Sequence, residues 1–197
     1  MKDLINYFNG MAEHWDEKKA PDNILEDLVS KFNPAAEDTI LDVGTGTGIL
    51  IPFIRKITGD KTRVCALDIS IEMLKRAKMK CHNSLTTAAL GDAAVLPFRS
   101  EIFTKTICFA VIPHLKDKNE GLKELTRVTK TGGRIFIAHL MGTDKLNTFH
   151  SSLNGVVKHD VLPSNAEFKS MVSRLPLEIV TFTDRDDLFF LELLRTG

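Results

Sequence analysis

The sequence has little cysteine and no long apolar stretch. Its 197 residues include three cysteines, Cys65, Cys81 and Cys108, which are too few and too scattered for a disulfide framework or a zinc site. No run of about 18 apolar residues occurs, and the N-terminal residues MKDLINYFNG lack the apolar segment of a signal peptide. Secreted and membrane-spanning classes are therefore disfavoured, and the composition predicts a cytoplasmic protein with no membrane partner.

The chain also lacks an excess of charge of either sign, since lysine plus arginine and aspartate plus glutamate each number 26. Non-specific binding to nucleic acid usually needs a basic excess, so no nucleic-acid partner is expected. Hydrophobic residues make up 43% of the chain, which is enough for a sizeable core. No repeat or Pro/Gly-rich linker divides the sequence, and a single domain over residues 1–197 is predicted.

Short apolar runs alternate with helical patterns along most of the chain. Strands are expected at residues 39–44, 63–70, 85–92, 104–112 and 134–141, and helices at 48–58, 70–80 and 119–130. Continuous apolar strands are typical of a sheet that helices cover on both faces. Ser70 is expected to cap the second helix, and Gly132-Gly133 to end the third. This alternation predicts an α/β fold with a doubly wound, mostly parallel sheet.

The C-terminal region departs from the alternation. Two strand patterns, residues 178–185 and 187–195, are joined by Arg185-Asp186-Asp187 alone. So short a connection permits only an antiparallel hairpin. The prediction is a three-layer, Rossmann-like fold whose seven-stranded sheet is mostly parallel and ends in an antiparallel hairpin.

Three glycines alternate with threonine directly after the first expected strand, in the segment Leu41-Asp42-Val43-Gly44-Thr45-Gly46-Thr47-Gly48. Glycine lets the backbone approach a ligand closely, although one glycine of this kind is also explained by a purely structural turn. The dinucleotide fingerprint G-x-G-x-x-G requires glycine at position 49, where the chain has isoleucine, and the Gly-Lys-Ser/Thr of a P-loop is absent. The spacing therefore argues against a nicotinamide cofactor.

This segment resembles the D-x-G-x-G-x-G signature of class I S-adenosylmethionine-dependent methyltransferases, and further landmarks follow in the order of that family. Asp68 ends the second strand, Gly91-Asp92-Ala93 resembles a G-D-A motif, and Leu96-Pro97-Phe98 matches the L-P-F that follows it. Residues 125–133 resemble L-x-R-V-L-K-P-G-G, with threonine at positions 129 and 131. The resemblance covers residues 35–140 and points to the small-molecule type related to the quinone-biosynthesis C-methyltransferases.

The resemblance implies that S-adenosyl-L-methionine binds at the carboxyl ends of the strands. Asp68 would accept hydrogen bonds from the ribose hydroxyls and Asp92 from the adenine amino group, since carboxylates are strong acceptors. Ile69 and Met73 would flank the adenine, although Met73 fits a helix core equally well. The expected cofactor-binding residues are Asp42, Gly44, Thr45, Gly46, Gly48, Asp68, Ile69, Met73, Gly91, Asp92, Ala93 and Phe109.

The segment Phe109–His114 ends the fourth strand and is expected to face the transferred methyl group. It lacks the Asn/Asp-Pro-Pro-aromatic motif of amine-methylating families and the acids of magnesium-dependent catechol-type enzymes, so no metal is expected. A general base is needed only where the acceptor loses a proton, because alignment alone accelerates an in-line displacement. The candidate bases are His114, His139, His150 and His159, each of which also fits an exposed or capping histidine. Of these, His114 and His150 are the predicted catalytic residues.

Two segments are expected to cover the crevice. Residues 1–33 would form an N-terminal helical cap, whose Tyr7 and Trp15 either seal the crevice or anchor the first helix to the core. Residues 140–165, which are rich in polar groups, would form a lid on the substrate side. The predicted function is methyl transfer to a small-molecule acceptor by in-line displacement. A non-catalytic protein that binds S-adenosylmethionine or S-adenosylhomocysteine and a nicotinamide-dependent oxidoreductase are the alternatives.

Overall fold

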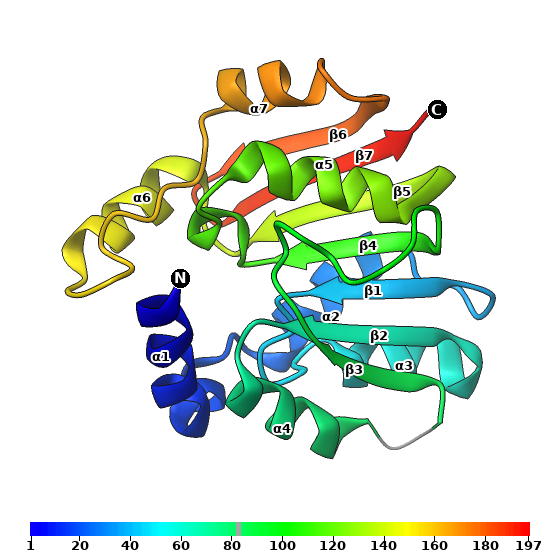
Figure 1. Cartoon of the computed structure of the whole chain (residues 1–197), viewed down its shortest axis with the longest axis horizontal. Coiled ribbons are helices and arrows are strands. Elements are labelled where there is room, and N and C mark those ends of the chain that lie inside the picture. Colours follow the sequence, from blue (N-terminus) through cyan, green and yellow to red (C-terminus); the bar gives the residue numbers. More distant parts are fainter. Residues whose placement is uncertain (82–83) are drawn as a thin grey trace.

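A seven-stranded sheet forms the centre of the computed structural model, which describes residues 1–81 and 84–197 (Figure 1). The strands lie in the order β3-β2-β1-β4-β5-β7-β6. Their bounds are Thr39–Val43 (β1), Arg63–Asp68 (β2), Thr86–Leu90 (β3), Phe103–Phe109 (β4), Thr129–His139 (β5), Leu177–Arg185 (β6) and Leu188–Arg195 (β7). From β1 the chain adds β2 and β3 on one side of the sheet and then returns to add β4 on the other side. The strand order therefore reverses between β1 and β4, and this is where α/β sheets bind ligands.

The first five strands are parallel, and β7 is antiparallel to both of its neighbours, β5 and β6. Leu41 of β1 lies opposite Cys65 of β2 and Thr106 of β4, so β1 is at the middle of the parallel part. The chain reverses between β6 and β7 through Asp186 and Asp187, as so short a connection requires. The predicted fold class and closing hairpin are confirmed.

Helices cover both faces of the sheet. One face carries α2 (Asp22–Lys31) and α3 (Ile51–Thr58), and the other carries α5 (Lys118–Val128) and α7 (Asn165–Val172). Helix α4 (Ile71–Lys80) packs beside β2 and β3, and two single turns, η2 (Gly59–Lys61) and η3 (Ile112–His114), connect elements. None of the helices in the described part of the chain is long and apolar enough to cross a membrane.

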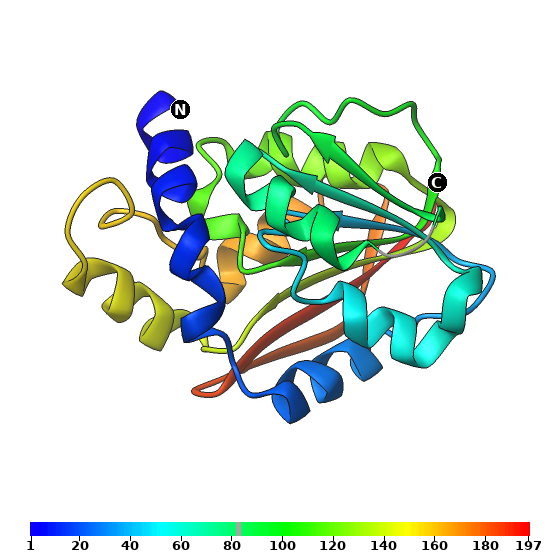
Figure 2. The ribbon, with the colours of Figure 1, turned by 90° about the horizontal axis from the view of Figure 1, so that it is seen from below.

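Three further helices lie beyond the carboxyl ends of the parallel strands. These are α1 (Lys2–Met11), the 3₁₀ helix η1 (Ala12–Lys18) and α6 (Thr143–Ser152). Figures 1 and 2 show α1 and α6 on the same side of the molecule, away from the sheet faces that the other helices cover. The edge of the sheet at which ligands are expected therefore lies beside α1, η1 and α6, whereas α2, which also belongs to the predicted N-terminal cap, packs on a face of the sheet.

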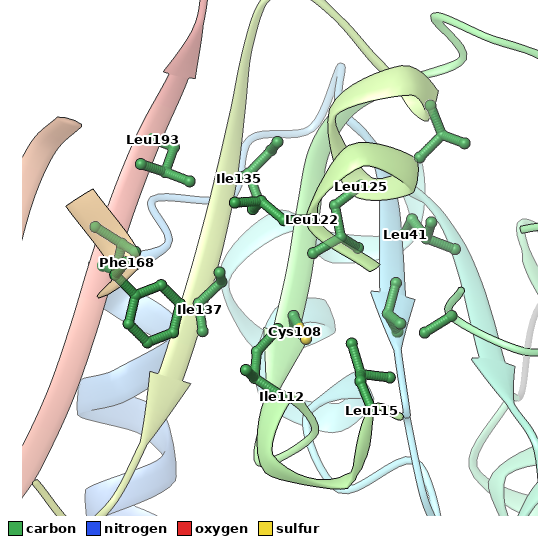
Figure 3. Packing of buried hydrophobic residues seen from close by; sticks show 14 of the residues in the cluster. Leu41, Cys108, Ile112, Leu115, Leu122, Leu125, Ile135, Ile137, Phe168 and Leu193 are labelled. Carbon is green, nitrogen blue, oxygen red and sulfur yellow. The ribbon is translucent and has the colours of Figure 1, made fainter. Parts of the chain in front are cut away.

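The sheet separates two hydrophobic clusters. Leu122 and Leu125 of α5 pack on the strand residues Cys108, Ile135 and Ile137, and all five side chains are buried (Figure 3). A leucine buried in this way contributes about 1.5–3 kcal/mol to stability. Burial also raises the pKa of the Cys108 thiol, so Cys108 behaves as a core residue. The cluster on the other face is formed mainly by side chains of α2 and α3 and of the strands β1, β4, β5 and β7.

Side-chain caps fix where several helices begin. Ser70 accepts a hydrogen bond from the backbone N–H of Met73, which confirms the predicted cap of α4. Asp117 caps α5 in the same way, and Ser164 with Glu167 forms a capping box at the start of α7.

The prediction that Gly132-Gly133 ends the third expected helix is wrong. Helix α5 ends at Val128, and Thr129 already has an extended backbone. Thr129 Oγ1 donates to the carbonyl of Leu125 at 2.7 Å and lies 2.7 Å from Thr106 Oγ1 of β4, so the sheet holds this residue. Gly132 does have a positive φ of 79°, but it lies in the irregular first part of β5.

Candidate functional site

A cavity of about 660 Å³ opens at the carboxyl ends of the parallel strands. It is lined by these predicted cofactor residues: Asp42, Gly44, Thr45, Gly46, Asp68, Ile69, Met73, Gly91, Asp92, Ala93 and Phe109. Gly48 is not part of the lining. The structure thus brings together residues from four strand ends that are as much as 67 positions apart in the sequence (Asp42 to Phe109).

The three glycines after β1 all have positive φ, at 66° for Gly44, 56° for Gly46 and 77° for Gly48, but they serve different purposes. A Cβ on Gly44 would lie 2.1 Å from Val111 Cγ2, and one on Gly48 would lie 3.1 Å from the backbone of Ala77 in α4. A Cβ on Gly46 would meet nothing closer than the Trp15 indole nitrogen, at 3.5 Å. Gly44 and Gly48 permit close packing, whereas the backbone of Gly46 faces the cavity.

Asp68, at the end of β2, is hydrogen-bonded to residues 44–48, which we call the glycine loop. Its carboxylate accepts hydrogen bonds from the backbone N–H of Gly46 and of Ser70, each at 2.8 Å. An ionised carboxylate has about four acceptor positions, so roughly two remain for a ligand. Burial raises the pKa of Asp68, and the backbone N–H groups of Ser70, Gly46 and Ile69 oppose that rise. The carboxylate therefore has the geometry needed to accept from a pair of adjacent hydroxyls.

Asp42 lies deeper, at the end of β1, with 1% of its surface exposed. Thr45 Oγ1 donates to it at 2.7 Å. Burial raises its pKa to about 7, and the nearby charge of Asp68 adds to this effect. Two acidic groups beneath the same loop favour a ligand that carries positive charge.

The far side of the cavity is formed by the residues after β3. Asp92 Oδ1 accepts from the backbone N–H of Ala94 at 2.9 Å, which leaves Oδ2 for a ligand. Met73 contributes to the lining and is also 1% exposed within α4, so it belongs both to the cavity wall and to the packed side of the helix. This arrangement suits a flat heterocycle with an exocyclic amino group.

The chain is strained just after β4. Ala110 has φ 58°, a conformation that costs a residue with a Cβ about 1–2 kcal/mol, and its N–H donates to Ala138 of β5 at 2.9 Å. The turn places Val111 against Gly44 and leads into η3, which ends at His114. Strain that the surrounding structure maintains is common beside functional sites.

Three of the four candidate histidines line the cavity, and His159 does not, because it is exposed on the outer side of its loop. His114 Nδ1 lies 2.6 Å from Asp160 Oδ2, and His150 Nδ1 lies 2.7 Å from the backbone oxygen of Asp160. His139 is 3% exposed, and burial lowers its pKa to about 3. Asp160 is a contact that the sequence analysis missed, because no local spacing connects it to His114.

The N-terminal segment docks over the glycine loop. Asp16 accepts from Thr47 Oγ1 and, at 2.7 Å, from Lys80 Nζ of α4. The Phe8 ring is 5.2 Å from the His114 ring and 5.9 Å from the Trp15 ring in edge-to-face contacts. Both Tyr7 and Trp15 line the cavity. The segment therefore contacts the expected cofactor side and the expected acceptor side together.

The expected acceptor side is mostly apolar. Its walls come from the N-terminal segment and from the chain after β5, and include Leu4, Phe8, Met11, Leu140, Met141, Leu146, Phe149, Leu153 and Val157. Although residues 140–165 are rich in polar groups, the surface that they turn to the cavity is apolar apart from His150. Within residues 1–81 and 84–197, no three His, Cys, Asp or Glu side chains are arranged to hold a metal ion.

Comparison with known proteins finds similarity to methyltransferases. A family described as "Methyltransferase domain" matches residues 41–137, about half of the chain. The ubiquinone/menaquinone biosynthesis C-methyltransferase UbiE of Geotalea daltonii is 34% identical over 114 residues, which cover 55% of this chain and 48% of that protein. The chain spans about half the length of the curated relatives that it matches.

Solved structures share the fold. An S-adenosylmethionine-dependent methyltransferase from Aquifex aeolicus aligns with a TM-score of 0.74 at 18% identity, over 94% of this chain and 98% of that one. A chain from a complex that contains the Trm112 methyltransferase activator of Haloferax volcanii aligns with a TM-score of 0.80 at 17% identity, over 96% of this chain and 98% of that one.

Proposed function

The chain belongs to the class I S-adenosylmethionine-dependent methyltransferases, and we propose that it binds S-adenosylmethionine in the cavity and methylates a small molecule there. When bound, S-adenosylmethionine supplies an electrophilic methyl group on a sulfonium. The observation that carries the proposal is the Asp68 carboxylate, which is fixed by Gly46 N–H and Ser70 N–H and retains free acceptor positions at the cavity wall.

The donor set fits this cofactor. Asp68 would accept from the ribose hydroxyls, Asp92 from the adenine amino group, and Ile69 with Met73 would flank the ring. The backbone of Gly46 allows a ligand to approach where a side chain would intrude. Burial raises the pKa of Asp42 and of Asp68, and a cationic ligand would favour the ionised form of both carboxyl groups.

The acceptor is proposed to be a small, apolar ring compound. Apolar and aromatic side chains form most of the walls beside His114, and such walls suit a ring rather than a charged metabolite. The relative from Geotalea daltonii is named as a C-methyltransferase of quinone biosynthesis, and a hydroquinone has the corresponding character. Holding the acceptor in line with the methyl group supplies much of the rate acceleration.

Calorimetry with S-adenosylmethionine tests the cofactor site. Asp68→Ala should weaken binding by about 1.5–3 kcal/mol, the value for a lost hydrogen bond to a charged group. Glu178→Ala, which removes an exposed acid of β6, is the control and should keep the wild-type affinity. Unchanged affinity in a folded Asp68→Ala variant, or micromolar binding of NAD to the wild type, would contradict the proposal.

Turnover separates an enzyme from a non-catalytic binding protein. Tritiated S-adenosylmethionine is incubated with pooled hydroquinones, phenols, amines and thiols, and S-adenosylhomocysteine formation is measured. Product that depends on an acceptor pool supports the proposed methyltransferase. Tight binding with no turnover in any pool favours a sensor or scaffold.

A further inference from the structure

Three imidazole rings and one aspartate from separate elements meet at the acceptor side of the cavity. His114 ends η3, His139 ends β5, His150 lies in α6, and Asp160 follows α6 in the segment before α7. The His114 and His150 rings are 5.4 Å apart. Asp160 contacts both, through its carboxylate to His114 and through its backbone oxygen to His150.

These contacts fix which ring nitrogen carries the proton. A backbone carbonyl only accepts a hydrogen bond, so the Nδ1 of neutral His150 must be the protonated nitrogen. An ionised carboxylate likewise only accepts, so His114 Nδ1 also carries the proton. In the part of the chain that the structure describes, Nε2 of neither ring has a hydrogen-bond partner. Each ring therefore offers a bare Nε2 lone pair to whatever enters the cavity.

The cations nearest to His114 along the chain are Lys116, which lines the cavity, and Lys118, which interacts with Asp160. Burial lowers the pKa of His139 to about 3 and also lowers the pKa of His150. His139 Nε2 is buried and has no partner among the described residues. Bare nitrogens between apolar walls favour a ligand that donates a hydrogen bond, because a carboxylate or phosphate would face their lone pairs.

We propose that this cluster selects a neutral acceptor by its O–H or N–H group, that His114 Nε2 removes the proton, and that Asp160 is the residue that positions His114 for this task. The inference rests on the proposed methyltransferase function. The acceptor's bond to hydrogen breaks and its proton goes to His114 Nε2. The electron pair left on the acceptor forms the new bond to the methyl carbon, directly or through a conjugated ring carbon. The carbon–sulfur bond breaks with its pair on sulfur, and the imidazolium then releases the proton to solvent.

Asp160 lies in the segment that covers the acceptor side, 46 residues after His114. The oriented base is therefore complete only while this segment rests on the cavity. His150 strengthens the arrangement, because its bond to the Asp160 backbone ties α6 to the same residue. A base that forms together with the cover acts only when the acceptor is shielded from water.

The ring tautomers can be observed directly by long-range ¹⁵N–¹H NMR of the histidines, with S-adenosylhomocysteine bound. We expect both His114 and His150 as Nδ1–H tautomers in the wild type. Asp160→Ala should shift His114 toward the Nε2–H tautomer and leave His150 unchanged, because His150 binds the backbone. Asp144→Ala, an exposed acid in the first turn of α6, is the control and should change neither ring. Nδ1–H on His114 in Asp160→Ala, or Nε2–H in the wild type, would overturn the positioning role.

Acceptor selection is tested by binding three matched probes to the protein loaded with S-adenosylhomocysteine. We expect 1-naphthol to bind at least tenfold more tightly than 1-methoxynaphthalene, which has no donor, and more tightly than 1-naphthoate. His114→Ala should abolish the preference, whereas His159→Ala should keep it, because His159 lies outside the cavity. Equal affinities, preference for the naphthoate or no binding of 1-naphthol would overturn the proposal.

The same samples separate this inference from the proposed function. If S-adenosylhomocysteine does not bind the wild type, the proposed function fails first. If it binds and the probes are not distinguished, only the acceptor inference fails. Where a turned-over acceptor is found, Asp160→Ala should lower kcat tenfold or more with little change in the KM for S-adenosylmethionine, and a purely structural role would not give that split.

Discussion

Asp42 shows how one buried carboxylate can make stability depend on pH. It is 1% exposed, and its pKa rises from 3.8 to about 7 on folding because burial disfavours the charged form. Between these two values the folded state binds a proton that the unfolded state has lost. The free energy of unfolding therefore falls as the pH rises from about 4 through 7. A cation bound beside Asp42, such as the sulfonium of the proposed cofactor, would offset part of this cost.

Asp42→Asn removes this titration while Thr45 can still donate to the amide oxygen. The variant should gain stability relative to the wild type by about 1–3 kcal/mol between pH 5 and pH 8. Urea unfolding of the two proteins across that range measures the difference. A stability difference that is constant with pH would show that Asp42 is already ionised in the folded protein.

For single residues, the sequence predicts the site residues that belong to recognisable local motifs. It does not predict contacts between residues that are distant in the sequence and that only the folded chain brings together. Asp68 and Asp92 were predicted because one ends a strand and the other follows a strand, each in a recognisable pattern, and both line the cavity. The contact of Asp160 with His114 was not, because neither residue has a periodic relation to the other. His159 was a candidate base, but it is exposed and does not line the cavity. The sequence does not predict this, because the way a loop packs decides which of its residues are exposed.

The glycine loop is the element in which three similar residues have different tasks. All three have positive φ, so a Cβ costs each about 1–2 kcal/mol in backbone strain. A Cβ on Gly44 would also lie 2.1 Å from Val111 Cγ2, whereas one on Gly46 would meet nothing closer than the Trp15 indole nitrogen, at 3.5 Å. All three glycine positions would therefore suffer similar backbone strain when substituted. The contact with Val111 is an additional cost that applies to a substitution at Gly44 and not to one at Gly46.

Gly44→Ala should therefore lower the free energy of unfolding by about 1–3 kcal/mol more than Gly46→Ala does. Val111→Ala in the Gly44→Ala background should recover part of that loss, because it removes the methyl groups in conflict. Gly46→Ala should instead reduce affinity for S-adenosylmethionine. Chemical denaturation of Gly44→Ala, Val111→Ala and the double variant against the wild type gives the coupling energy, and calorimetry measures the ligand affinity of Gly46→Ala. Additive effects of the Gly44 and Val111 changes would rule out the contact as the cause.

Elements were predicted well where one interaction dominates. The apolar strands and the closing hairpin follow from burial on two faces and from a two-residue turn, and both were predicted. The end of α5 was not, because the hydroxyl of Thr129 is held by Thr106 of β4, a contact across the sheet. The apolar inner face of residues 140–165 was missed for a similar reason, since its side chains come from a helix and a loop with no common period.

At the scale of the whole molecule, the N-terminal segment connects the two sides of the cavity. Trp15 and Asp16 lie at the glycine loop, and Phe8 lies against His114. Asn9 also accepts from Ser70 Oγ at 2.7 Å, which ties α1 to the start of α4. If the proposed cofactor binds beneath this segment, we expect the attachment of the segment to slow ligand release.

Asp16→Ala removes the bonds to Thr47 and Lys80 without touching the cavity floor. Because the Asp16–Lys80 pair is partly exposed, its loss is worth no more than about 1 kcal/mol, with a similar value for the Thr47 bond. We expect S-adenosylhomocysteine to dissociate about three- to tenfold faster from this variant. Trp15 is the only tryptophan of the chain, so stopped-flow fluorescence follows the release directly. Glu13→Ala removes an exposed acid from the same short helix and should leave the rate unchanged. If the two variants release the ligand at the same rate, the attachment at Asp16 does not control how the N-terminal segment opens.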